Sequence, residues 1–117
     1  GHLYKRSHLQ HVQGSMKYGT NKSEQALIRS MGGTPHKNSG RGQKKADGTV
    51  NGFVVDVKEG GKSFTLNTSV WAKVCTDAAK VDFRKDPALI ISLNDGKTQL
   101  AIIALDVFER LIDAESD

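Results

Sequence analysis

Asp47 and Asp56 are two carboxylates that a tight turn between them is expected to bring face to face. Asn51-Gly52 is a strong signal for a two-residue β-hairpin with a type I′ turn, in which both central residues have positive φ. Counting outward from that turn pairs Asp47 with Asp56. The Cβ atoms of directly opposed residues lie about 4.5–5.5 Å apart, so two charged carboxylates in these positions repel each other.

A divalent cation between Asp47 and Asp56 would offset this repulsion. Mg²⁺ prefers a few carboxylate oxygens and keeps its other positions for water and phosphate. Lys58 lies two residues beyond Asp56, on the same face of the strand, where its ammonium group can orient or help to deprotonate an attacking water. Such a metal would polarise a phosphoryl oxygen and stabilise the leaving alkoxide. The three residues therefore predict hydrolysis of a phosphodiester.

The same residues also allow arrangements that need no metal. One aspartate can be protonated or turned to solvent, and Lys45 and Lys58, which oppose each other in this register, can neutralise the pair. A slipped register or a bulge would remove the opposition of the carboxylates altogether. The acid-x-lysine pattern is not specific by itself, since Asp95-Gly96-Lys97 repeats it within a polar turn.

The elements that must position these side chains alternate between helices and strands. Asn21 and Glu24 have capping-box spacing ahead of an apolar stripe that stops at Gly32-Gly33, which predicts a first helix. Asn67, Thr68 or Ser69 can cap a second helix, whose stripe runs from Val70 to Val81, and Asp106 can cap a third. The expected strands and extended segments cover residues 34–37, 53–58, 63–66, 88–93 and 99–104.

This order predicts an α/β fold with a mixed central β-sheet flanked by helices. A strand, a helix and then a fully apolar strand indicate a parallel crossover. A chain of 117 residues builds one domain, which we expect over residues 16–117. Residues 1–15 carry three histidines without periodicity and precede Met16, so we expect a disordered or artificially added leader, with metal binding by the histidines as the alternative.

Charge is distributed unevenly along the chain. Lys and Arg number 17 against 13 Asp and Glu, a net charge of +4. Four of the cations lie in one glycine-rich loop, which indicates a polyanionic partner or, alternatively, only a solubilising loop. With one cysteine, Cys75, no intramolecular disulfide can form, and no apolar run is long enough to span a membrane, so we expect an intracellular protein. The loop cations are Lys37, Arg41, Lys44 and Lys45.

The order of these motifs resembles the PD-(D/E)XK nuclease superfamily, and within it the small Holliday-junction resolvases of archaea and bacteriophages. The resemblance covers most of residues 22–111 and implies a restriction-endonuclease-like αβββαβ core. Asp47 matches the first aspartate of the motif, and Asp56-Val57-Lys58 matches the acid-x-lysine on the following strand. Ala46 stands where the motif has proline, and Asp56 where close relatives more often have glutamate. Glu24 matches a glutamate of the first helix.

The resemblance implies a role for each of these positions. Asp47, Asp56 and the Val57 carbonyl would bind Mg²⁺, for which Mn²⁺ is expected to substitute, and Lys58 would position the water. Glu24 would join the metal site, although its place in the capping box explains it equally well. The loop and one later serine would contact DNA. The expected DNA contacts are Lys37, Asn38, Ser39, Arg41, Lys44, Lys45 and Ser63.

The resulting functional expectation is a Mg²⁺-dependent, structure-selective endodeoxyribonuclease. The resemblance implies a homodimer that cuts branched DNA such as a four-way junction, leaving 5′-phosphate and 3′-hydroxyl ends, in the cytoplasm of a prokaryotic cell or bacterial host. Two alternatives remain open. One is a nuclease of the same fold that acts on duplex or single-stranded DNA, and the other is a non-catalytic DNA-binding phage accessory protein.

Overall fold

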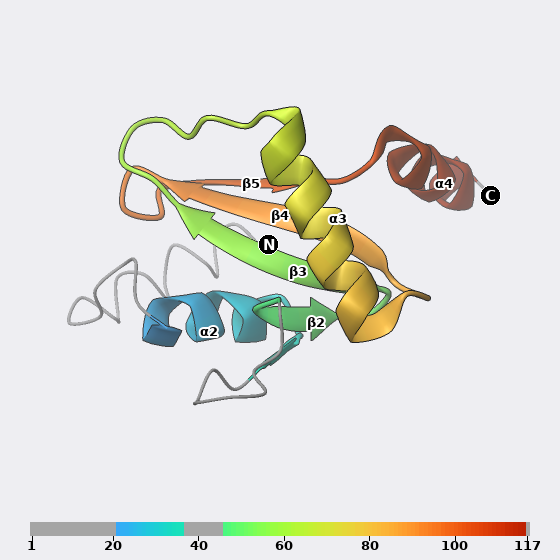
Figure 1. The fold of residues 1–117 in the computed structure, drawn as a ribbon, viewed down its shortest axis with the longest axis horizontal. Coiled ribbons are helices and arrows are strands. Elements are labelled where there is room, and N and C mark those ends of the chain that lie inside the picture. The colour runs from blue at the N-terminus through green and yellow to red at the C-terminus, as the bar shows by residue number, and fades with distance from the viewer. Residues whose placement is uncertain (1–20, 37–45, 117) are drawn as a thin grey trace.

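A five-stranded mixed sheet with three helices makes up the described part of the chain, residues 21–36 and 46–116 of the computed structural model (Figure 1). The sheet order is β1-β2-β3-β4-β5, in which β3 and β4 run parallel and every other neighbouring pair is antiparallel. The expected α/β class is confirmed. The elements are α2 (Asn21–Ser30), β1 (Thr34–Pro35), β2 (Gly48–Val50), β3 (Phe53–Glu59), α3 (Thr68–Asp82), β4 (Asp86–Leu93), β5 (Thr98–Ile102) and α4 (Leu105–Ser116).

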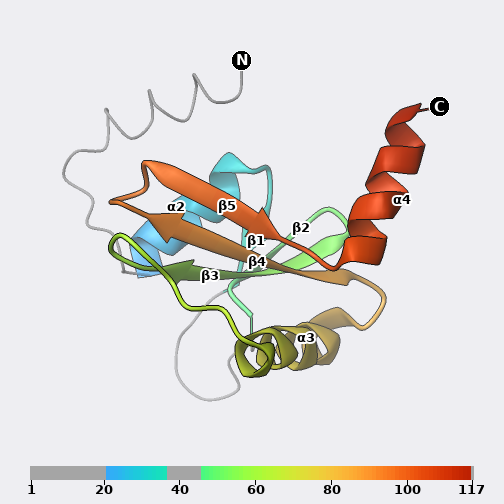
Figure 2. The same ribbon diagram turned by 90° about the horizontal axis from the view of Figure 1, so that it is seen from above.

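Helices α2 and α3 cover opposite faces of the sheet (Figure 2). Ile28 of α2 is fully buried against Val55 and Val57 of β3. On the other face, Ala78 of α3 packs with Val54. Because side chains alternate along a strand, β3 buries apolar residues on both faces, as expected of a central strand next to a parallel neighbour. The face that carries Val54 also carries Asp56 and Lys58.

Helix α3 begins and packs as its sequence predicts. Asn67 has an extended backbone, and its Oδ1 accepts a hydrogen bond of 2.9 Å from the Val70 N–H, which is the geometry of an N-cap. Val74 and Ala78 are buried, and the half-buried Trp71 packs against the cluster that contains Val74. Helix α3 is thus the crossover that connects the two parallel strands, and it lies on the side of the sheet that carries Asp56.

The other two helices begin differently from the prediction. Asn21 already belongs to α2, whereas a capping box would place it one position before the first helical residue. Helix α4 begins at Leu105, so Asp106 lies in its first turn and not at the N-cap. The Ala104 carbonyl accepts the first bonds of that helix, from Val107 and Phe108. Asp106 still lies where an acidic side chain favours the helix dipole.

Strand boundaries shift by up to two residues. Strand β1 comprises Thr34 and Pro35, and Lys37, the last residue of the strand predicted there, lies outside the described residues. Residues 63–66 belong to no strand. Strand β4 starts two residues early, at Asp86, and includes Pro87, and β5 ends two residues early, at Ile102. None of the helices in residues 21–36 and 46–116 is both long and apolar enough to cross a membrane.

Candidate functional site

A β-bulge at Asp47 shapes the centre of the candidate site. The hairpin register is confirmed as far as Gly48, which pairs with Val55. The Asp47 N–H then donates to the carbonyl of that same Val55 at 3.1 Å, so two residues of one strand face a single residue of the other. The predicted opposition of Asp47 and Asp56 in the strand ladder is therefore wrong, because the ladder ends at Gly48 and the Asp47 N–H bonds to Val55.

The carboxylates nevertheless meet, because the bulge turns the Asp47 side chain along β3. Its Oδ2 accepts a hydrogen bond of 2.7 Å from the Val57 N–H, one residue beyond Asp56. Burial, followed by a side-chain hydrogen bond with Asp56, raises the pKa of Asp47 to about 7. The negative charges of Asp56 and Glu24 act in the same direction. Two carboxylates in contact are stabilised by a proton or a cation between them.

Lys58 lies on the same face of β3 as Asp56 and forms an ion pair with it. Its Nζ lies 3.3 Å from Oδ2 of Asp56. The Asp56 side chain is only 16% exposed, whereas that of Lys58 is 44% exposed. The ammonium group is thus held by the carboxylate at the edge of solvent.

Glu24 lies within electrostatic range of this pair but on a different element, α2. Burial raises the pKa of Glu24, and the charges of Glu59 and Asp56 raise it further, while Lys58 lowers it. Ser23, also on α2, donates a hydrogen bond of 3.3 Å to Glu59. Within the described residues, no group of three or more histidine, cysteine, aspartate or glutamate side chains is arranged to hold a metal. The structure thus brings Asp47 and Asp56 into contact, with Glu24 nearby.

Oxygen ligands of the kind that Mg²⁺ prefers are present at this point. Asp47 and Asp56 supply carboxylate oxygens, and one or two carboxylates with water and substrate oxygens form a usual Mg²⁺ environment. The N–H and C=O groups of one strand residue point to the same side of the strand. Because the Val57 N–H points to Asp47, the Val57 carbonyl lies on that side as well. These residues fit a hard divalent cation, with water completing its coordination.

Sequence reasoning missed a basic and an acidic residue on α3. Lys73 Nζ lies 2.6 Å from Oδ2 of Asp77, which is 8% exposed although it interrupts the apolar stripe of the helix. The hydrogen bond and the charge of Asp77 raise the pKa of Lys73, and the charge of Asp56 adds to the effect. The signal in the sequence was an acid inside an apolar helix face, four residues after a lysine. Lys73 adds a second cation to the surroundings of Asp56.

His36 and Ala46 bring the two ends of the basic loop together beside Asp47. The His36 N–H donates to the Asp47 carbonyl at 2.8 Å, and Nδ1 of the same histidine lies 2.9 Å from the Ala46 carbonyl. The predicted DNA contacts Lys37, Asn38, Ser39, Arg41, Lys44 and Lys45 lie outside the described residues. Ser63 is exposed in the loop after β3.

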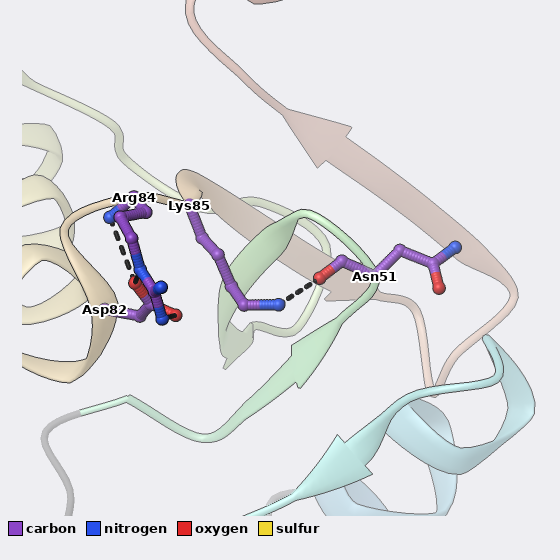
Figure 3. Close-up of polar contacts among 4 residues, drawn as sticks. All are labelled: Asn51, Asp82, Arg84 and Lys85. Carbon is purple, nitrogen blue, oxygen red and sulfur yellow. Dashed lines mark hydrogen bonds and ion pairs between the residues drawn. The ribbon is translucent and has the colours of Figure 1, made fainter.

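The Asn51-Gly52 turn, which sets the hairpin register, is hydrogen-bonded by residues that follow α3 (Figure 3). Lys85 Nζ donates to the Asn51 carbonyl at 2.5 Å, and the Asp86 N–H donates to the Gly52 carbonyl at 2.9 Å. Asn51 has a φ of 50°, whereas Gly52 is not in the positive-φ region, so the predicted type I′ turn is wrong. The two-residue register survives because these outside contacts fix the turn.

Comparisons with known proteins add no relative to this picture: no family model, no curated protein and no solved structure matches the chain.

Proposed function

We propose that this protein is a Mg²⁺-dependent endodeoxyribonuclease. The observation that carries the proposal is the contact between Asp47 and Asp56, with Lys58 paired to the second carboxylate at 3.3 Å. A half-buried carboxylate pair with one raised pKa is the kind of arrangement found at functional sites. It also supplies the oxygen ligands that phosphodiester hydrolysis with Mg²⁺ requires.

Each side chain has a separate part in the proposed reaction. Asp47, Asp56 and the Val57 carbonyl would hold the cation, and Glu24 would act on it through a water. When bound, the cation would polarise a phosphoryl oxygen and stabilise the leaving alkoxide. Lys58 orients the attacking water and is kept in place by Asp56. The Val57 N–H orients Asp47, since a hydrogen bond of 2.7 Å fixes that carboxylate relative to β3.

DNA as the substrate is supported by charge beside this site. His36 and Ala46, which flank the segment that contains Lys37, Arg41, Lys44 and Lys45, are held next to Asp47. Four cations in the sequence between His36 and Ala46 suit a phosphate backbone, and Lys73 of α3 adds positive charge near Asp56. We therefore propose that the DNA backbone passes beside the carboxylate pair at its solvent-exposed edge, where Lys58 is 44% exposed.

Other features of the proposal rest on the resemblance of the motifs alone. These are the preference for branched DNA such as a four-way junction, the paired cuts by a homodimer, the 5′-phosphate products, the substitution of Mn²⁺ for Mg²⁺ and the setting in a prokaryotic or host cytoplasm. A nuclease of the same fold that cuts duplex or single-stranded DNA would use the same Asp47 and Asp56 pair.

One observation favours a second candidate, a non-catalytic DNA-binding accessory protein. The described residues hold no group of three metal-ligating side chains, and Asp47 and Asp56 can share a proton instead of a metal. Such a protein would keep the basic loop and bind DNA equally well in Mg²⁺ and in EDTA.

A cleavage assay separates the candidates. The protein is incubated with a labelled four-way junction, a linear duplex and a single strand, each with Mg²⁺ and with EDTA. The proposal predicts Mg²⁺-dependent cleavage, with the junction as the preferred substrate. Cleavage of only the duplex or only the single strand would keep the nuclease but assign it that DNA as its substrate. Binding to DNA without cleavage of any of the three would replace the nuclease by the accessory protein.

A further inference from the structure

Four large apolar side chains of α4 are exposed on one side of the helix. Leu105, Phe108, Leu111 and Ile112 are 69%, 51%, 49% and 47% exposed, and their spacing of i, i+3, i+6 and i+7 aligns them in what we call the α4 stripe. Figure 2 shows α4 projecting beyond the end of the sheet, whereas α2 and α3 lie against its two faces. The exposed parts of the stripe amount to roughly 400 Å², the size of apolar patches that are often functional on single proteins.

A different side of α4 holds the helix to the body of the protein. Val107 is 4% exposed, and Arg110 forms an ion pair of 3.0 Å with Asp86 at the start of β4. Both residues lie more than about 100° around the helix from the centre of the α4 stripe. A helix of 12 residues is marginally stable in water, and most helical stability in proteins comes from burial of an apolar face. We therefore expect the stripe to gain its burial from another molecule.

A row of carboxylates borders the α4 stripe. Asp106, Glu109 and Asp113 are exposed and follow one another at i, i+3 and i+7, which places them along one edge of the stripe. Glu115 adds a fourth carboxylate in the last turn, and Arg110 is the one cation of the helix, so α4 carries a net charge of −3. The apolar surface of α4 is thus bordered by negative charge.

The C-terminal end of α4 adds to this preference for a cation. The helix dipole places partial negative charge at a C-terminus, where cationic side chains are stabilising. The last turn of α4 instead carries Asp113 and Glu115 and no basic residue. A cationic side chain from outside the helix would therefore stabilise α4 and neutralise its carboxylates at the same time.

These charges select among the molecules that could cover the α4 stripe. The carboxylates repel DNA and anionic membranes, and two α4 helices lying side by side would repel each other. A partner helix with an apolar stripe and a row of cations along its edge meets both features, since paired helices bury apolar seams and align opposite charges beside them. We propose that the α4 stripe is the docking site for a basic amphipathic helix of another protein. The proposal rests on α4 alone and stands whether or not this protein cleaves DNA.

Fluorescence anisotropy with the full chain and labelled synthetic peptides tests the proposal. The probe is an amphipathic helix of about 18 residues built from leucine and lysine, with the leucines at i, i+3, i+4 and i+7. One matched peptide has glutamate in place of every lysine, and another has the same composition in scrambled order. The leucine–lysine helix should bind at least about ten-fold more tightly than either control, and its affinity should fall with salt.

Variants of α4 should change this preference in a defined way. Glu109→Lys combined with Glu115→Lys should weaken binding of the lysine peptide and strengthen binding of the glutamate peptide, a reversal that a loss of folding cannot produce. Phe108→Ala should weaken binding of the lysine peptide about ten-fold, because apolar contact is lost. Phe83→Ala is the matched control, since Phe83 is 82% exposed at the end of α3, and this variant should bind like the wild type.

Several results would overturn the assignment. Equal affinity for the lysine and glutamate peptides, or no binding of the lysine peptide, would remove the basic helix as the occupant. Equal loss in Phe83→Ala and Phe108→Ala would mean unspecific apolar association. Sedimentation equilibrium in which the wild type dimerises and Phe108→Ala does not would assign the stripe to a second copy of the chain. A lower melting temperature of monomeric Phe108→Ala than of Phe83→Ala would show that the chain itself covers the stripe.

Discussion

The carboxylate of Asp47 accepts a hydrogen bond of 2.7 Å from the backbone N–H of Val57. This contact ties the bulge to the centre of β3 and determines where the carboxylate points. Without the bulge, Asp47 would lie in the strand ladder opposite Asp56. With it, the two side chains meet while the Asp47 N–H remains bonded to Val55. The geometry of the candidate metal site therefore depends on one irregular step in the backbone.

Gly48→Ala should destabilise the protein by about 1–3 kcal/mol, the usual cost of forcing an extra methyl into a packed site. A Cβ at Gly48 would lie 2.8 Å from the Thr34 carbonyl oxygen and 2.9 Å from Cδ1 of Ile28. Urea denaturation measures the change. Gly52→Ala is the matched control, because its Cβ would meet nothing within 4 Å and its φ is not in the positive region. Equal stability of the two variants would show that β2 is not packed as tightly as described.

The free energy of unfolding should fall as pH rises from about 4 to about 7 in the absence of divalent metal. The pKa of Asp47 is raised from 3.8 to about 7 in the folded protein. A raised carboxyl pKa means that the protonated form folds better, so its stabilising contribution is complete below the unfolded pKa and is lost as pH passes the folded one. Allowing for solvent screening, the loss is about 2 kcal/mol.

Asp47→Asn should remove most of this pH dependence, because an amide does not titrate and its oxygen can still accept from the Val57 N–H. Mg²⁺ should stabilise the wild type more at pH 8 than at pH 5, since only the ionised pair binds it. Thermal melts at several pH values measure both effects. If the stability of Asp47→Asn still fell with pH as steeply as that of the wild type, another group would be titrating in this range.

Lys73→Ala should weaken DNA binding with little change in kcat. The Lys73 side chain is 74% exposed and lies within electrostatic range of Asp56. We therefore expect it to contact a phosphate of DNA bound beside Asp56. Loss of one phosphate contact reduces the slope of log affinity against log salt concentration by about 1. Lys80→Ala, seven residues further along the same helix, should change the slope less. Equal slopes for the wild type and Lys73→Ala would remove this residue from the DNA surface.

The parts of the fold that depend on periodicity could be predicted from the sequence. The apolar stripe of α3 with its Asn67 cap and the alternation along β3 correspond to structure, and the Asn51-Gly52 turn indicated the right register as far as Gly48. Local patterns of this kind are fixed by side-chain spacing and by turn length.

The bulge could not be predicted, because tertiary packing determines it. Nothing within residues 46–48 shows that Gly48 must fit beneath Ile28 and Thr34, which come from α2 and β1. The i,i+4 ion pair of Lys73 with Asp77 is local and had a signal in the sequence, whereas the proximity of Lys73 to Asp56 exists only because α3 crosses over the sheet. The starts of α2 and α4 differed from the predicted ones, because capping depends on backbone geometry as well as on residue type.

Single-turnover cleavage of DNA in Mg²⁺ by the wild type, Asp56→Asn and Lys58→Ala tests the central claim most directly. The metal site predicts that both variants lose at least about a hundred-fold in rate while their affinity for DNA in EDTA stays close to that of the wild type. Lys62→Ala, which removes an exposed cation four residues beyond Lys58, should cleave at the wild-type rate. Cleavage by Asp56→Asn and Lys58→Ala at the wild-type rate would contradict the claim that Asp47, Asp56 and Lys58 form the active site.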